Sequence, residues 1–299
     1  MNNSNRRRHF LKQTGVAGVA SFLPLSLFAS SPNLKMGLQL FTIRDAMAKN
    51  PIDSLKYARN LGYQDGEIYG YDGDNDLYYG MKSTEFKTVL EDVDFSISSG
   101  HYDFSSRFSV SNAELMRYVD QCIHGSIRIG SSYITWPWLA PEFRTMDNFK
   151  RLAEKLNTIG ERVTDAGLGF AYHNHDFEFV DHDGQIGYDL IVSETDPKLV
   201  KLQMDMYWVA HSSKKSPAEL IAANPGRYVM WHIKDMDKVT RDYSEMGNGS
   251  IDYVQLLSAI DKHDVQYYYI EQGGNFAENS LESIATSAQY FKKNLQHYL

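Results

Sequence analysis

The sequence predicts a single (β/α)8 barrel, and three observations support this fold class. From Lys35 onward, strand-like runs rich in β-branched and aromatic residues alternate with amphipathic helical patterns, which is the order of a parallel sheet covered by helices. Eight such strands begin about 28 to 38 residues apart, and no GxGxxG sequence follows the first strand to indicate a dinucleotide-binding sheet. The last four strands each end on a histidine or a carboxylate, and barrel active sites lie where strands end.

The eight expected strands are short and largely apolar, as parallel strands buried on both faces are. They are Met36–Thr42, Gly66–Tyr69, Phe95–His101, Tyr133–Trp136, Gly169–His175, Val200–Met206, Tyr228–Lys234 and Gln266–Glu271. Because such a barrel needs roughly 250 residues, we expect residues 35–299 to form one domain. The loops Gly70–Gly80 and Tyr102–Val110 follow the second and third strands, so they should line the ligand pocket.

Helix start and stop signals stand between these strands. Pro51 can open a helix that Gly62 ends, while Ser83 and Ser111 are expected N-caps. Ser111 is followed by Glu114 at capping-box spacing. The remaining expected helices span Thr145–Ala166, the segment opened by Ser216-Pro217, Asp252–His263 and Asn279–Leu295.

Residues 1–31 are expected to be an export signal. Three consecutive arginines, Arg6 to Arg8, precede an apolar stretch from Gly15 to Ala29, which is shorter than the roughly 20 residues of a membrane span. The order RRHFLK at residues 7–12 resembles the twin-arginine motif, which a receptor reads. We therefore expect a periplasmic protein with no stable membrane anchor, and a disordered basic N-terminus is the alternative.

Composition narrows the class of partner. The net charge of −8 disfavours nucleic acid, which calls for a basic face. Twenty tyrosines and four tryptophans suit a ligand that stacks on rings, such as a sugar. The single Cys122 excludes an internal disulfide framework and a thiolate zinc site. Composition does not determine the oligomeric state, and a homo-oligomer is one of the states that it allows.

The strand-end side chains point to a metal site. His173, Asp205, His232 and Glu271 come from four successive strands, so they should meet at the barrel mouth. Carboxylate oxygen and neutral imidazole suit Mn, Mg, Zn or Co. His175 lies two residues beyond His173 and therefore faces the same side.

Three other polar residues could line the pocket. Glu67 on the second strand and His101 on the third are candidates for substrate contact. Lys234 shares a strand face with His232, and it could either stabilise an oxyanion or pair with Asp235.

These motifs together resemble the sugar phosphate isomerase/epimerase family, whose barrel is xylose isomerase-like and related to the type 2 AP endonucleases. The resemblance runs from Lys35 through GLQLFTIRD, GYQDGEIYGY, HNHDFEF, DMYW, HIKD and IEQ. It implies that Asp205, His232 and Glu271 bind a metal, and that Trp208 contacts the substrate.

The chain departs from that family on the fifth strand. Relatives such as ketose 3-epimerases and inosose isomerases place a glutamate there, whereas this chain has Tyr172-His173-Asn174-His175. The fourth metal ligand is therefore His173 or Glu178. A symmetrical exchange of a proton between two glutamates is not expected, and His175 becomes the candidate base, with Glu178 next.

The sequence therefore predicts a divalent-metal-dependent carbohydrate isomerase or epimerase. It would remove a proton next to a carbonyl through an enediolate, with His175, Glu271 and Lys234 in catalytic roles. One alternative is a lyase or hydratase of the same fold acting on 3-keto-glycosides or inososes. The other is a catalytically inactive sugar-binding barrel.

Overall fold

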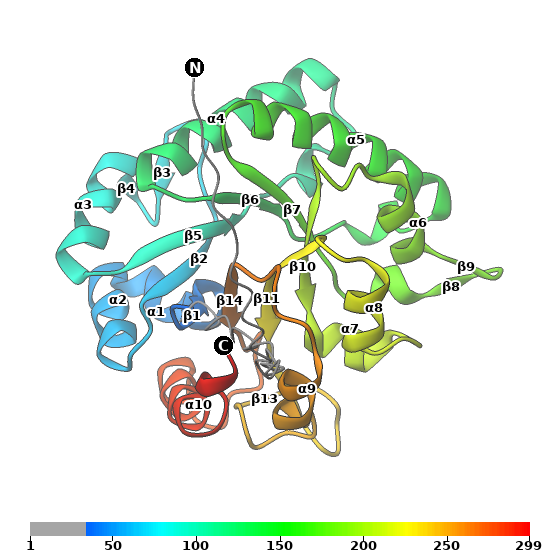
Figure 1. The fold of residues 1–299 in the computed structure, drawn as a ribbon. Coiled ribbons are helices and arrows are strands. Elements are labelled where there is room, and N and C mark those ends of the chain that lie inside the picture. The colour runs from blue at the N-terminus through cyan, green and yellow to red at the C-terminus, as the bar shows by residue number, and fades with distance from the viewer. Residues whose placement is uncertain (1–33) are drawn as a thin grey trace, which may run out of the picture. The chain divides into compact units, whose positions relative to one another are not determined.

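Eight parallel strands close into a barrel in the computed structural model, which describes residues 34–299 (Figure 1). Around the barrel the strands follow the order β1-β14-β11-β10-β7-β6-β5-β2. Helices surround them, so the predicted (β/α)8 fold is confirmed. The bounds are β1 Gly37–Gln39, β2 Asp65–Tyr69, β5 Ser96–His101, β6 Tyr133–Trp136, β7 Gly169–His173, β10 Lys201–Asp205, β11 Tyr228–Ile233 and β14 Tyr267–Ile270.

Two of the eight predicted strands end two or more residues earlier than expected. β1 gives way to a 3-10 turn at Leu40–Ile43, because the Gln39 side chain accepts a hydrogen bond from the Phe41 backbone N–H. β7 ends at His173, because the side chain of the next residue, Asn174, accepts a hydrogen bond from the backbone N–H of Asp205 at 3.0 Å. Both early ends lie at the mouth of the barrel.

The helices begin largely where the capping residues predict. Ser111, Thr145, Ser216 and Asn279 each accept a hydrogen bond from the backbone N–H three residues on, which satisfies an otherwise unpaired donor of the first turn. The bounds are α1 Arg44–Lys49, α2 Pro51–Asn60, α3 Ser83–Val93, α4 Asn112–Ile129, α5 Met146–Asp165, α6 Gly187–Glu194, α7 Met206–Ser212, α8 Pro217–Ala223, α9 Tyr253–Ala259 and α10 Ser280–Asn294.

The prediction that Ser83 caps a helix is wrong. Ser83 is the first residue of α3, and its hydroxyl donates to Asp76 Oδ2 at 2.7 Å instead. Likewise α9 ends at Ala259, before the expected His263, because Ile260 is extended.

Three small hairpins extend the loops on the side where the strands end (Figure 1). They are β3–β4 (Leu77–Tyr78 with Met81–Lys82), β8–β9 (Asp181–His182 with Gln185–Ile186) and β12–β13 (Asp235–Met236 with Tyr243–Ser244). Each follows a barrel strand and precedes a helix, so the hairpins belong to the face on which barrel enzymes carry their sites.

The barrel interior is filled by side chains, and a small cluster of Tyr133, Ala171, Val229, Met230 and Tyr269 lies apart from the main helix–strand core. Within residues 34–299, no helix is both long and apolar enough to cross a membrane. The expected export signal at residues 1–31 lies outside the described residues and stays a prediction.

Candidate active site

A cavity of about 400 Å³ opens at the ends of the barrel strands. That volume lies within the range of small-molecule sites. The loops expected to line it, after β2 and β5, do contribute residues. The lining comprises Phe41, Tyr69, Gly70, His101, Tyr102, Asp103, Ser105, Pro137, Trp138, His173, His175, Lys234, Tyr243, Glu271 and Gly273.

An ion-paired group forms the base of this cavity. Lys234 Nζ lies 2.7 Å from Asp205 Oδ2 and 2.8 Å from Glu271 Oε2, and all three side chains are buried. Burial alone would lower the pKa of Lys234, but the two carboxylates outweigh it and raise that pKa above its usual value. Burial would also raise the pKa of Glu271, yet Lys234 and His232 hold it below its usual range. Lys234 and Glu271 are therefore charged at neutral pH.

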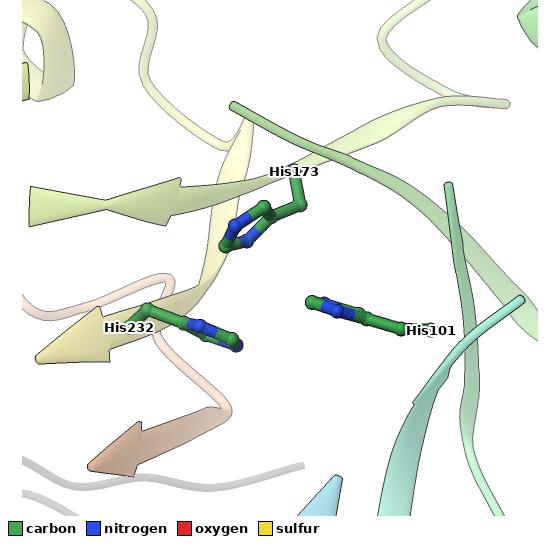
Figure 2. A group of neighbouring side chains, drawn as sticks. All are labelled: His101, His173 and His232. Carbon is green, nitrogen blue, oxygen red and sulfur yellow. The ribbon is translucent and has the colours of Figure 1, made fainter. Parts of the chain in front are cut away.

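Three imidazoles converge next to this group, from His101, His173 and His232 (Figure 2). Their ring centroids lie 4.5 to 5.3 Å apart. His232 stands between two carboxylates: its Nδ1 bonds to Glu271, and its Nε2 lies 2.6 Å from Glu67 Oε2. Burial would lower the pKa of His232, but Glu67 and Glu271 raise it to about 9. In this arrangement His232 is an imidazolium that donates on both sides.

Gln203 sets the tautomer of His173. Gln203 Nε2 donates to Glu67 Oε1 at 2.6 Å, which turns Gln203 Oε1 toward His173 Nδ1 at 2.9 Å. Because an amide oxygen can only accept, His173 carries its proton on Nδ1. Its Nε2 then has a free lone pair, and it lies 3.6 Å from Asp205 Oδ2. Burial and the neighbouring His232 also lower the pKa of His173 well below its usual value, so the ring is neutral.

These residues fit a divalent cation. The donor atoms of Asp205, His232 and Glu271 lie within 4.8 Å of one another, and His173 Nε2 faces Asp205 with its lone pair free. Three buried carboxylates, those of Glu67, Asp205 and Glu271, lie in this group. Burial raises the pKa of Asp205 above its usual value, although Lys234 and His232 oppose this. A divalent ion at this point would stabilise the ionised form of the carboxylates that bind it.

Of the two candidates for the fourth ligand, the geometry favours His173 over Glu178. Glu178 accepts hydrogen bonds from the Tyr172 hydroxyl at 2.6 Å and the His175 backbone N–H at 2.9 Å. It is buried and does not line the cavity. Burial raises its pKa to about 8, so Glu178 is protonated at neutral pH. These contacts indicate a structural role for Glu178, and they favour neither a metal ligand nor a base at this position.

Glu67 does not contact the cavity, contrary to its predicted role in substrate binding. It is fully buried beneath the imidazoles. Its Oε1 accepts from Ser99 and Gln203, and its Oε2 lies within 3 Å of nitrogen atoms of Gln39, His101 and His232. A carboxylate with so many donors orients the rings above it.

His175 and Trp208 lie side by side with their ring centroids 5.8 Å apart. His175 lines the cavity, as expected for a base, whereas Trp208 is not among the lining residues. Both His175 Nδ1 and Trp208 Nε1 are buried without a hydrogen-bond partner in the described structure. Burial, followed by the nearby Lys234 charge, lowers the pKa of His175 well below its usual value. His175 is therefore neutral at neutral pH.

The sequence interpretation missed two kinds of residue here. The buried amides of Gln39 and Gln203 organise the network, and Gln203 could have been noticed because it precedes Asp205 by two on the same strand face. The aromatic lining from Phe41, Tyr69 and Trp138 was also missed. Tandem strand-end aromatics such as Trp136 and Trp138 were the available signal for it.

Comparison with known proteins identifies a barrel family that matches most of the chain. The family model described as xylose isomerase-like TIM barrel matches residues 55–294. An inosose dehydratase from Clostridium perfringens is 26% identical over 167 residues, which cover 49% of this chain and 55% of that protein. The chain thus spans just over half the length of the curated relatives it matches.

Solved structures agree on the fold. A sugar phosphate isomerase/epimerase from Parabacteroides distasonis superposes with a TM-score of 0.77 at 25% identity, covering 90% of this chain and 96% of that one. The IolI protein, solved with a bound zinc atom, superposes with a TM-score of 0.70 at 16% identity, covering 89% and 99%. At that lower identity the likeness concerns the fold alone.

Proposed function

Because the chain belongs to the xylose isomerase-like TIM barrel family, we propose that it is a metal-dependent carbohydrate lyase. It would remove a proton beside a carbonyl and then expel an oxygen substituent from the neighbouring carbon. The observation that carries the proposal is the cluster of His173 Nε2, Asp205, His232 and Glu271 at the base of the cavity. The similarity to an inosose dehydratase supports elimination over isomerisation.

The metal would be held by His173, Asp205, His232 and Glu271. When bound, a divalent ion supplies Lewis-acid polarisation of the substrate carbonyl. Lys234 already contacts two of these ligands, so its ammonium lies where it can offset negative charge that develops on the carbonyl oxygen.

We assign removal of the substrate proton to His175. It lines the cavity as a neutral ring, and a neutral imidazole can take a proton from carbon. Glu271 is held as a carboxylate by Lys234 and His232, so it cannot serve as a matching acid. The two groups therefore have different roles. In the balanced step a C–H and a C–O bond break, a C=C bond forms, and the proton leaves on the expelled oxygen.

Deuterium exchange tests the proposal. The metal-loaded protein is incubated in D2O with an inosose and with a 3-keto-glucoside, and NMR follows both the proton beside the carbonyl and the products. We expect exchange together with an unsaturated ketone. His175→Ala should abolish exchange while it retains the metal, and His173→Ala should lose both. An isomerised ketose without an unsaturated product would instead support the isomerase activity that the sequence predicts. Metal binding without exchange on any keto sugar would favour a sugar-binding barrel.

A further inference from the structure

The two halves of the cavity, divided by the strand order of the barrel, differ in their charged and aromatic residues. His173, Lys234 and Glu271 line one half from β7, β11 and β14 or the residues just after them, with Asp205 and His232 buried behind them. The opposite arc, β6, β5, β2 and β1, contributes Trp138, Tyr69 and Phe41, together with His101, Asp103 and Ser105 from β5 and the loop after it. A ligand that fills the cavity meets Lys234 and Glu271 on one side and the rings of Phe41, Tyr69 and Trp138 on the other.

Two of the aromatic residues are unusual because they are exposed. Phe41 is 39% exposed and Trp138 is 40% exposed. Among residues 34–299, six large hydrophobic side chains are exposed, and the two aromatic ones both line this cavity. Leaving such rings in water forfeits the free energy of their burial, so their shared place at the cavity indicates that a ligand covers them.

Neighbouring groups hold both rings in place. The Arg44 guanidinium lies 4.4 Å from the centre of the Phe41 ring and donates to the Phe41 carbonyl at 3.0 Å. The Arg144 guanidinium lies 4.2 Å from the centre of the Trp138 ring, whose edge-on neighbour is His175 at 5.0 Å. Rings that are fixed before binding lose little entropy when a ligand stacks on them.

We propose that Phe41 and Trp138 bind a second ring attached to the reacting sugar, so that the substrate is a glycoside with a flat apolar aglycone. This inference rests on the proposed function, because the reacting sugar is placed on the charged half of the cavity. The contact between Trp138 and His175 joins the aglycone surface to the assigned base. The oxygen expelled in the elimination would then be that of the aglycone, which leaves as an alcohol in place of water.

Binding of unreactive glycosides tests this surface without turnover. Calorimetry with metal-loaded protein compares 4-nitrophenyl D-glucopyranosides with methyl D-glucopyranosides, in both anomers. Neither sugar carries a ketone, so neither should react. We expect the aryl compound to bind about tenfold more tightly, from stacking on two rings.

Substitutions locate the preference. Phe41→Ala and Trp138→Ala should each reduce it, and Phe41→Leu and Trp138→Leu should do the same while they keep apolar bulk. Val254→Ala, at an exposed hydrophobic residue on α9 outside the cavity, should leave it unchanged. Any of three results would overturn the inference. These are equal binding of the aryl and methyl glycosides, no binding of either, and an aryl preference that survives in all four ring variants.

The proposed function can fail separately. If the metal-loaded parent shows no deuterium exchange with keto sugars but still prefers aryl glycosides, the lyase activity is refuted and the aromatic binding surface is not.

Discussion

Glu67 should set the metal affinity although it would not touch the metal. In Glu67→Gln the shape is kept while the charge that accepts from His232 Nε2 at 2.6 Å is removed. A hydrogen bond to a charged group is worth about 1.5–3 kcal/mol, and carboxylates that orient metal-bound histidines change metal affinity about 10- to 100-fold. The two scales agree, because a 10- to 100-fold change corresponds to about 1.4–2.7 kcal/mol.

Calorimetric titration of Mn²⁺ or Zn²⁺ into metal-stripped protein measures this effect. Asp65→Asn is a matched control, since Asp65 is a buried carboxylate on the same strand, two residues earlier, with hydrogen bonds from Ser96 and Ser98. The control should alter stability and leave metal affinity within about twofold. If Glu67→Gln binds metal as tightly as the parent, or if Asp65→Asn weakens it equally, the assigned role of Glu67 is wrong.

Three further predictions concern the ligand set, a buried acid and export. Asp205→Ala should strip the metal from the purified protein, since it removes one of four ligands, and metal analysis that finds one ion per chain would contradict this. Because burial raises the pKa of Glu178 from 4.5 to about 8, the folded state keeps a proton that the unfolded chain releases. The stabilisation is complete below about pH 4.5 and is lost as pH rises toward 8. The free energy of unfolding of the parent relative to Glu178→Gln should therefore fall by about 1.4 kcal/mol per pH unit across that interval, and a difference that is constant in denaturant titrations would refute it. Finally, the proposed twin-arginine signal predicts that Arg7→Lys with Arg8→Lys leaves precursor in the cytoplasm, whereas normal secretion would indicate the general route.

The fold could be predicted from local patterns, because strand and helix periodicity and capping residues act over a few neighbouring positions. Every predicted barrel strand is present, and most helices begin at their predicted caps. The short helices α1, α6 and α7 were not predicted, since they lack the length for a clear periodic pattern.

The site network depends on register across the barrel, which a sequence does not display. Gln39 is the register partner of Glu67, and Gln203 is that of His173. These pairings create the amide bridges, yet neither glutamine belongs to a recognisable motif. The chain also turns so that Glu178 reaches Tyr172 away from the cavity, which spacing from His175 could not reveal.

The position of the metal tests the account most directly. A crystal of the metal-loaded protein measured at the absorption edge of Mn or Zn would give an anomalous difference peak at the bound ion. We predict one peak about 2.0–2.2 Å from His173 Nε2 and from oxygen or nitrogen atoms of Asp205, His232 and Glu271. A peak elsewhere, or no peak with Lys234 still between Asp205 and Glu271, would contradict the proposed metal centre.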